Sequence, residues 1–516
     1  MAVEKEFSLE SIEHSLKRRG FIRDLLTLKK HIFHPKFSVS VEKLCSYAGL
    51  DLDKCSNLTA KTRRRKVMAV CAVQPTFQKG CICVQLYEDT EEDMRWAVRN
   101  GALAIVVKKA IDGLPCIVSD SPETIYAKMC RYYRKLSDAK AVAITGSIGK
   151  TTTKFMIDCV LKKQFNTICN PTNENVMFQV GHCAQHIPMD AQILVQEISE
   201  GTPGYTSLMS EMVDPDIVVI TTIDKSHMEA FGSGEKIIEE VCSITKGLSP
   251  DARVVVNKDE FKWFDKLQTQ HVVTVSLNDP SADLSANNIT ITHDGLAFDV
   301  LVKESNRKYP VLLKNIYAVH NVVSALSAFA VGLHFKTSPE LIVSGLQEFK
   351  MKGVRQNVLR TADDITIYAD CFNAVATSVK AAIKACDQIP VNGKRIAVLG
   401  DVEEGGKDSE MQHDMIVQSV NESQFSIFIA IGEKIQKAIN RIPVGEHCKV
   451  ICCNDHKEIL AALKNHCSGG DLVLFKASYA YKLFLCIAKM WPSLVAEVQN
   501  AEKEEYSTWW NRIKMS

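Results

Sequence analysis

The chain has 516 residues, of which 46% are apolar and 24% are charged, and its formal net charge is +1. This length predicts about three domains, each able to bury its own core, and the composition is ordinary for a globular protein. The near-zero charge gives no reason to expect a nucleic acid or an anionic membrane surface as a partner. No segment approaches the ~20 consecutive apolar residues of a transmembrane helix, and residues 1–20 lack the apolar core of a signal peptide. We therefore predict a cytoplasmic protein without a membrane span, and we expect a monomer.

The 18 cysteines are scattered along the chain, and several lie inside apolar runs, such as Cys81, Cys83 and Cys159. The scatter and the lack of a Cys-x-x-Cys pair argue against a zinc site or a disulfide framework. Reduced, buried thiols in a cytosolic protein fit this pattern better.

The first 138 residues divide into an extension and a small domain. Residues 1–36 are predicted to form a polar helical extension, to which we assign no chemistry. From residue 37 to 138, predicted strands at 80–86 and 102–107 alternate with predicted helices at 92–99 and 121–136. This alternation is typical of a small α/β domain.

Residues 141–154 form the most informative segment. An apolar run at 141–144 predicts a buried strand, a glycine turn at 146–149 breaks it, and a helical pattern follows. The glycines let backbone N–H groups approach an anion, and the helix N-terminus adds a partial positive charge. The usual P-loop has four residues between its glycines and this one has two, so a strand–helix turn carrying Lys-Thr by chance is the alternative. The residues predicted to hold a nucleotide are Gly146, Ser147, Gly149, Lys150, Thr151 and Thr152.

The middle block, residues 139–350, repeats strand and helix with polar residues at the strand ends. Glu197 follows the strand at 193–195, and His227 follows the strand at 216–223. In an open parallel sheet, ligands bind beyond the carboxyl ends of the strands, so these side chains should converge near the phosphate loop. A β-rich stretch is predicted at 272–302 and a helix at 317–332.

Glu197 and His227 are candidate metal ligands beside Thr151. A carboxylate at this strand end could hold the metal that bridges nucleotide phosphates, although a capping or surface acid would give the same pattern. A lone histidine is more often structural, but its place at a strand end favours a metal or phosphate role. We therefore assign catalysis to Lys150, Glu197 and His227, and metal binding to Thr151, Glu197 and His227.

Residues 351–516 contain five more predicted strands, which alternate with helices and indicate a second doubly wound sheet. They lie at residues 365–369, 395–399, 425–431, 449–453 and 471–475. A hinge is expected near residues 350–353. The predicted fold class is α/β with three domains: a central P-loop domain with a parallel sheet, a small N-terminal α/β domain and a C-terminal Rossmann-like domain.

Together these motifs resemble the Mur ligase family, the ATP-dependent carboxylate–amine ligases of peptidoglycan assembly, over roughly residues 37–500. The loop Thr-Gly-Ser-Ile-Gly-Lys-Thr-Thr is similar to the shortened P-loop of that family, and Ser-His-Met-Glu-Ala-Phe-Gly-Ser to its His motif. Residues 317–325 resemble the segment whose asparagine holds adenine, here Asn321. Arg355 matches the interdomain Arg motif, and Asp370 matches the acid on the ribose or phosphate side.

Residues 368–374, 398–413 and 470–478 are similar to the branch of the family that adds D-alanyl-D-alanine to UDP-N-acetylmuramoyl-tripeptide. The resemblance implies ATP and Mg²⁺ as cofactors, and a UDP-sugar peptide and a dipeptide amine as substrates. It also implies a two-step reaction, in which ATP phosphorylates a substrate carboxylate and the amine then attacks the acyl phosphate.

Two departures from the family pattern keep alternatives open. The family's carbamoylated lysine, which supports a second metal, falls at Val241, with Lys236 and Lys246 both out of register. The uridine-contact motif Asp-Ser-Arg appears as Ala-Lys-Thr-Arg at residues 60–63. The altered first domain motivates a related ligase with a different acid or amine, and the missing lysine motivates a non-catalytic nucleotide-binding scaffold.

Overall fold

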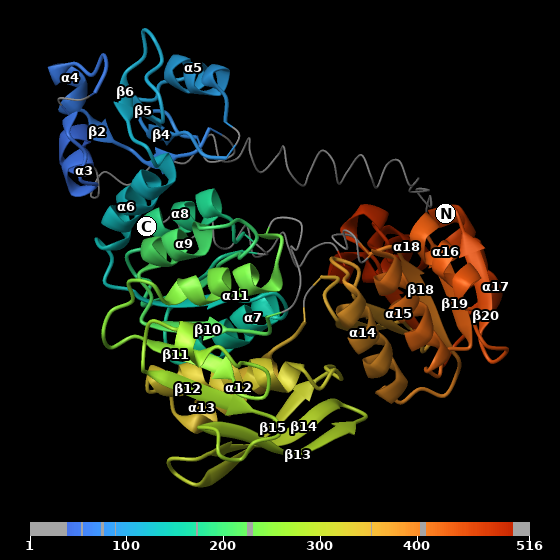
Figure 1. The fold of residues 1–516 in the computed structure, drawn as a ribbon. Coiled ribbons are helices and arrows are strands. Elements are labelled where there is room, and N and C mark those ends of the chain that lie inside the picture. Colours follow the sequence, from blue (N-terminus) through green and yellow to red (C-terminus); the bar gives the residue numbers. More distant parts are fainter. Residues whose placement is uncertain are drawn as a thin grey trace, which may run out of the picture.

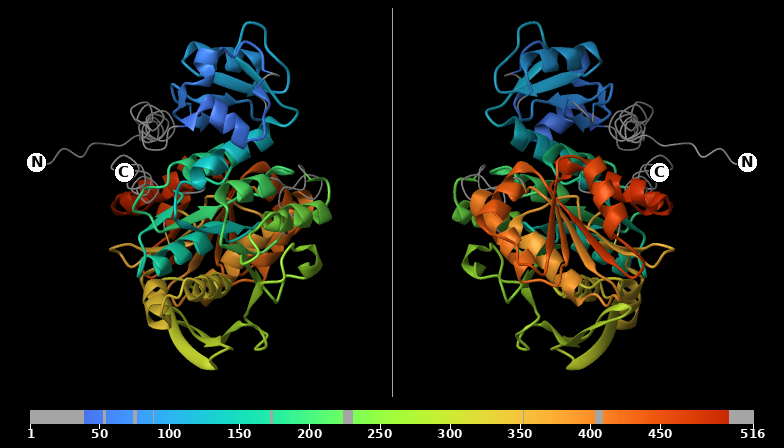
Figure 2. Two further views of the ribbon diagram at one scale, coloured as in Figure 1. Left: turned by 90° about the vertical axis from the view of Figure 1, so that its left-hand side faces the viewer. Right: turned by 90° about the vertical axis from the view of Figure 1, so that its right-hand side faces the viewer.

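The computed structural model describes residues 39–498 except 53–54, 74–76, 88, 172–173, 224–230, 352 and 403–408. These residues form three main sheets, which follow one another along the chain and are covered by helices (Figure 1). Figure 2 shows the small first sheet at one end of the molecule and strands β13–β15 at the other. The predicted α/β fold class, with a central sheet flanked by a small N-terminal sheet and a C-terminal sheet, is confirmed. The predicted extension at residues 1–36 lies outside the described residues.

The N-terminal part has a parallel four-stranded sheet in the order β3-β4-β5-β6. Helix α5 begins with a capping box, in which the Thr90 hydroxyl and the Asp93 carboxylate each accept from the other residue's backbone N–H. A short antiparallel pair, β1 and β2, lies beside the sheet. The bounds are β1 (Val39–Ser40), α3 (Val41–Tyr47), α4 (Ala60–Arg63), β2 (Lys66–Val67), β3 (Val70–Cys71), β4 (Ile82–Val84), α5 (Glu91–Arg99), β5 (Ala104–Val107), β6 (Cys116–Val118) and α6 (Pro122–Arg134).

Helix α6 joins the first sheet to the central one. Its buried residues Tyr126 and Met129 belong to a continuous apolar core that includes Val84 of the first sheet and Leu194 of the central sheet. The Arg134 guanidinium, also buried, donates to the backbone oxygens of Val213 and Ala139 at 2.7 Å each. A shared core of this kind holds the two sheets in a fixed relation.

The central sheet has nine strands in the order β15-β14-β13-β12-β11-β10-β7-β9-β8. Strands β7 to β13 run parallel, and β13, β14 and β15 continue the sheet as an antiparallel meander. The strands are β7 (Lys140–Thr145), β8 (Thr167–Cys169), β9 (Ile193–Glu197), β10 (Ile217–Ile220), β11 (Arg253–Asn257), β12 (Val272–Ser276), β13 (Leu284–Thr292), β14 (Gly295–Val302) and β15 (Arg307–Lys314). The helices are α7 (Lys150–Leu161), α8 (Met177–Gln185), α9 (Tyr205–Val213), α11 (Gly234–Cys242), α12 (Asn321–His334) and α13 (Pro339–Glu348).

Both faces of the parallel part are buried, which explains why its strands are apolar without alternation. Along β7, Ala141 and Ala143 face the core under α6, α8, α9 and α11, whereas Val142 and Ile144 face the core under α7, α12 and α13. Strand β15 was missed in the sequence. It is an edge strand with a polar outer face and tolerates Pro310, so it lacks the continuous apolar pattern.

The C-terminal sheet has six strands in the order β16-β17-β21-β18-β19-β20, all parallel except β16. Strand β16 was also missed. It is a four-residue strand at the edge of the sheet and pairs with β17 alone. The bounds are β16 (Asn357–Arg360), β17 (Thr366–Ala369), α14 (Ala376–Gln388), β18 (Arg395–Gly400), α15 (Ser409–Asn421), β19 (Ile427–Ile431), α16 (Glu433–Arg441), β20 (Lys449–Cys453), α17 (His456–His466), β21 (Leu472–Lys476) and α18 (Phe484–Met490). Tyr317 and Ala318, just before α12, pack in the same core as Val358 and Tyr368, so the central and C-terminal sheets are in contact.

All 18 cysteines lie within the described residues, and none of them forms a disulfide. Burial raises the pKa of most of these thiols, for example that of Cys45 to about 12, as expected for structural thiols. Among the helices that the structure describes, none combines the length and the apolar character needed to cross a bilayer.

Candidate functional site

The turn between β7 and α7 has the geometry of an anion cradle. Gly146 and Gly149 have φ angles of 123° and 90°, which favour glycine. A Cβ added at Gly146 would lie 2.3 Å from Thr221 Oγ1, so only glycine fits there. The backbone N–H groups of Ser147 and Ile148 donate to the Thr222 oxygen at 2.8 and 3.2 Å. The turn is therefore fixed against β10, with the N-terminus of a twelve-residue helix directly behind it.

Lys150, the first residue of α7, is held inside the cradle. Its ammonium group donates to Glu200 Oε2 at 2.9 Å and also contacts the backbone oxygens of Gly146 and Ser147. The Glu200 side chain is fully buried, and that of Lys150 is 13% exposed. A buried acidic partner thus holds the Lys150 ammonium group at the cavity wall.

Thr151 and Glu197 place three oxygen atoms together at the base of the cradle. The Thr151 hydroxyl donates to the two Glu197 oxygens at distances of 3.0 and 3.2 Å, and the Asn175 amide donates to Glu197 Oε1 at 2.8 Å. Lys154, which is fully buried on the next turn of α7, lies with its Nζ 3.4 Å from Glu197 Oε2 and donates to the Asn170 oxygen.

The charge state of Glu197 follows from these neighbours. Burial by itself raises the pKa of the carboxyl group. Lys154, followed by Lys150 and Arg355, outweighs burial and brings the pKa of Glu197 below its ordinary value. Glu197 is therefore an anion at neutral pH, the state in which a carboxylate binds a cation.

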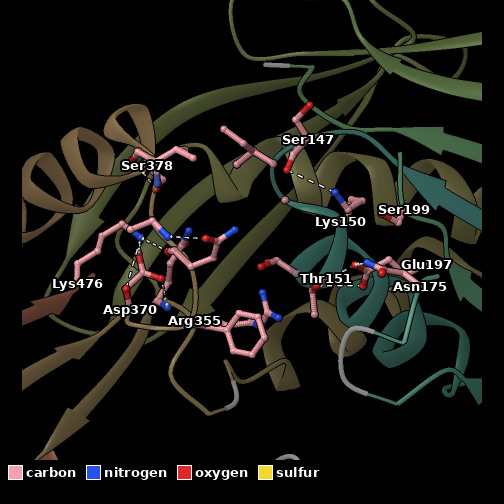
Figure 3. Close-up of a pocket in the computed structure, with 18 residues that line it drawn as sticks. Ser147, Lys150, Thr151, Asn175, Glu197, Ser199, Arg355, Asp370, Ser378 and Lys476 are labelled. Carbon is pink, nitrogen blue, oxygen red and sulfur yellow. Dashed lines mark hydrogen bonds and ion pairs between the residues drawn. The ribbon is translucent and has the colours of Figure 1, made fainter. Parts of the chain in front are cut away.

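The C-terminal sheet supplies the opposite wall. Lys476, at the end of β21, donates to Asp370 Oδ2 at 2.7 Å, and Asp370 Oδ1 accepts from the Gln356 backbone N–H at 3.2 Å. The Arg355 guanidinium carbon lies 3.5 Å from the centroid of the Phe372 ring, a cation–π contact. These charged groups face the cradle across the gap between the two sheets (Figure 3).

Both walls enclose one cavity of about 310 Å³. The cradle side contributes Ser147, Ile148, Gly149, Lys150, Thr151, Thr152, Asn175, Glu197 and Ser199, and the C-terminal side contributes Arg355, Gln356, Asp370, Phe372, Asn373, Ala374, Val375, Ser378 and Lys476. A neighbouring cavity of about 250 Å³ shares Ile148, Gly149, Gln356 and Ser378 and extends along β10, β11 and α12. The two adjoining cavities therefore differ. The first has several cationic side chains that suit an anionic ligand, and the second is more apolar.

The structure brings most of the predicted site residues to this cavity: Ser147, Gly149, Lys150, Thr151, Thr152, Glu197, Arg355 and Asp370 all line it. Gly146 does not line the cavity, but it begins the glycine turn that does. Asn321 lines neither cavity; it is 2% exposed, and its amide donates to Gln356 Oε1 at 3.1 Å. His227 lies outside the described residues.

Sequence reasoning missed Glu200, Lys154 and Lys476. A buried lysine one turn after the phosphate loop gives no signal by itself, and Glu200 follows the strand end of β9 by three residues without a motif. Val241 is buried on α11, and Lys236 and Lys246 are both exposed and line neither cavity. Within the described residues, then, neither lysine is placed to substitute for the missing one.

The donor set beside the cradle fits Mg²⁺. Within the described ranges, no group of three or more His, Cys, Asp or Glu side chains is arranged to hold a metal ion. Mg²⁺ does not need such a group, because it commonly binds through one or two protein oxygens and takes its other ligands from phosphates and water. The Thr151 hydroxyl and the Glu197 carboxylate supply protein oxygens of that kind.

Comparison with known proteins agrees with this architecture. The family model of the Mur ligase middle domain matches residues 144–332, and that of the Mur ligase glutamate ligase domain matches residues 354–479. The UDP-N-acetylmuramoyl-tripeptide–D-alanyl-D-alanine ligase of Bacillus subtilis is 30% identical over 402 residues, which cover 75% of this chain and 84% of that protein. The chain therefore belongs to the Mur ligase family of ATP-dependent amide ligases.

Solved structures share the fold. MurF from Acinetobacter baumannii superposes with a TM-score of 0.73 at 21% identity, covering 88% of this chain and 98% of that one. The MurF ligase of Thermotoga maritima, solved in complex with ADP, gives a TM-score of 0.67 at 22% identity, covering 84% of this chain and 96% of that one.

Proposed function

We propose that this chain is the ligase that joins D-alanyl-D-alanine to UDP-N-acetylmuramoyl-tripeptide, with cleavage of ATP to ADP and phosphate. The observation that carries the proposal is the cavity of about 310 Å³ between the phosphate cradle and the wall of the C-terminal sheet that carries Arg355 and Lys476. The relative from Bacillus subtilis, whose printed name describes this reaction, supports the choice of substrates. The domains would be residues 37–138 for the sugar nucleotide, 139–350 for ATP, and 351–516 as a Rossmann-like ligase domain that closes the nucleotide site.

In the first step, a carboxylate oxygen of the acid substrate attacks the γ-phosphorus of ATP, and the bond to the β,γ-bridging oxygen breaks. ADP leaves, and the acid becomes an acyl phosphate. Lys150 and the backbone N–H groups in the first turn of α7 would hold the phosphates in line with the attacking oxygen. Thr151 and Glu197 would hold Mg²⁺, which would supply positive charge against the phosphates. Arg355 faces them from the other wall.

In the second step, the amine nitrogen attacks the acyl carbon, phosphate leaves and the ammonium proton is lost, so that an amide forms. Phosphate is a far better leaving group than hydroxide, which is why the reaction consumes ATP. Water would compete with the amine for the acyl phosphate, so closure of the C-terminal sheet onto the cradle would protect the intermediate. Asp370 and Lys476 would move with that wall and contact the nucleotide or the reacting groups.

A second candidate keeps the chemistry and changes the acid. In the segment that aligns with the family's uridine motif, Arg63 belongs to the four-residue helix α4, and its guanidinium donates to the Leu52 backbone oxygen at 2.7 Å. The two residues before this arginine, Lys61 and Thr62, stand where the family motif has Asp-Ser, which favours an acid substrate without the usual uridine contact.

The test is product formation from purified protein with Mg-ATP, followed by mass spectrometry. UDP-N-acetylmuramoyl-tripeptide with D-alanyl-D-alanine should give the dipeptide adduct, and the variant Lys150→Ala should not. A folded protein that binds ATP but forms no adduct with this pair would refute the proposed substrates. Amide formation with another acid or amine would then establish the second candidate, and no amide with any pair would leave a nucleotide-binding scaffold.

A further inference from the structure

The cradle contains a carboxylate that the proposed chemistry does not use. Glu200 lies three residues beyond Glu197, in the segment between β9 and α9, and its side chain is fully buried. Its Oε2 atom accepts from Lys150 Nζ at 2.9 Å. Lys150 lines the cavity and Glu200 does not, so the carboxylate lies behind the lysine as seen from the cavity.

The cradle is thus built from two buried ion pairs. Lys154 pairs with Glu197, and Lys150 pairs with Glu200, so that two positive charges face two negative charges. Among the residues that the structure describes, each lysine has an acidic partner before any phosphate arrives. A nucleotide phosphate that reaches Lys150 brings negative charge close to Glu200, in a buried setting where charges are weakly screened.

We propose that Glu200 is a positioning residue for Lys150, which it holds against the cradle and shares with the incoming phosphate. This inference rests on the proposed nucleotide site. Glu200 opposes the binding of free ATP and ADP alike, because phosphate and carboxylate compete for one ammonium group. In return, Glu200 fixes the position of the Lys150 ammonium group during phosphoryl transfer. Glu200 therefore contributes to kcat and not to nucleotide affinity.

The isosteric variant Glu200→Gln separates these effects. It removes the competing charge and keeps a side-chain oxygen within reach of Lys150. Metal-free ADP should bind roughly tenfold more tightly than to the parent protein, since one repulsive charge at short range is lost. The value of kcat should fall, because the lysine is less firmly placed and ADP leaves more slowly. A merely structural role would instead weaken binding.

The binding of a fluorescent ADP analogue in the presence of EDTA provides the measurement. Glu240→Gln is the matched control: Glu240 is a buried acid on helix α11, which accepts from the Gly204 and Thr206 N–H groups. The control should lower the melting temperature and leave the ADP affinity unchanged.

Equal or weaker ADP binding by folded Glu200→Gln would overturn the inference. If that variant does not fold, Glu200→Asp decides: it keeps the charge but shortens the reach, so kcat should fall while ADP affinity stays within about twofold of the parent. An unchanged kcat in that variant would also overturn the inference. Failure of the parent protein to bind any nucleotide, with or without Mg²⁺, would refute the proposed nucleotide site itself.

Discussion

The buried pair of Lys154 and Glu197 gives the sharpest test of how the cradle is stabilised. The variant Lys154→Met keeps most of the side-chain volume and removes the charge 3.4 Å from Glu197 Oε2. Both side chains are at most 1% exposed, so solvent compensates little for the lost partner. Breaking a buried pair by removing one member typically costs about 3–5 kcal/mol, because the other charge is left buried.

Thermal denaturation measures the expected loss of stability. For a domain of 150–250 residues, each kcal/mol lowers the melting temperature by about 2–4 °C, which predicts a drop of roughly 10 °C in the transition of the central sheet. The matched control is Lys437→Met, which breaks an exposed pair with Glu433 on α16 and should leave the melting temperature almost unchanged. The double variant Lys154→Met/Glu197→Gln should recover part of the loss, since no buried charge remains.

The loss should also depend on pH. In the parent protein the pKa of Glu197 lies below its ordinary value, so its ionised form contributes stability above about pH 4.3, the usual pKa of an unfolded glutamate, and this is lost as pH falls through the folded pKa. Without Lys154 that pKa rises, and the destabilisation is largest at neutral pH and shrinks on acidification. Equal melting temperatures of Lys154→Met and Lys437→Met at pH 7 would refute this reasoning.

Three further predictions concern the two walls. Arg355→Ala should lower kcat by more than it weakens nucleotide affinity, and Arg355→Lys should not restore the rate, because lysine lacks the planar group that stacks on Phe372; steady-state kinetics separates the two constants. Gly146→Ala should abolish ATP binding, since its Cβ would meet Thr221 Oγ1 at 2.3 Å, and normal calorimetric binding would contradict this close packing. Thr151→Val should raise the Mg²⁺ concentration needed for half-maximal turnover and reduce Mn²⁺ binding seen by electron paramagnetic resonance; unchanged Mn²⁺ binding would remove Thr151 from the metal site.

The phosphate cradle could be predicted because its signal is local. Strand, glycine turn, Lys150 and helix follow one another within fourteen positions, and each has a physical requirement that few residues meet. The parallel core strands were equally accessible, because burial on both faces makes them uniformly apolar. The edge strands β15 and β16 have no such pattern and were missed.

The contacts that complete the site connect residues that are far apart in the sequence. Lys150 and Glu200 are separated by 50 residues, and Asp370 and Lys476 by 106, so only the strand order of the folded sheets brings each pair together. Asn321 was expected at the base of the nucleotide. In the structure α12 begins at that residue, and its amide is directed to Gln356 of the C-terminal part.

The central claim is that ATP activates a substrate carboxylate as an acyl phosphate. The most direct measurement uses UDP-N-acetylmuramoyl-tripeptide labelled with oxygen-18 in its terminal carboxylate, together with D-alanyl-D-alanine and Mg-ATP. One labelled oxygen from each reacting carboxylate should appear in the released phosphate, which ³¹P NMR resolves as an isotope shift, and Lys150→Ala should abolish this transfer. Amide formation with unlabelled phosphate would contradict this claim.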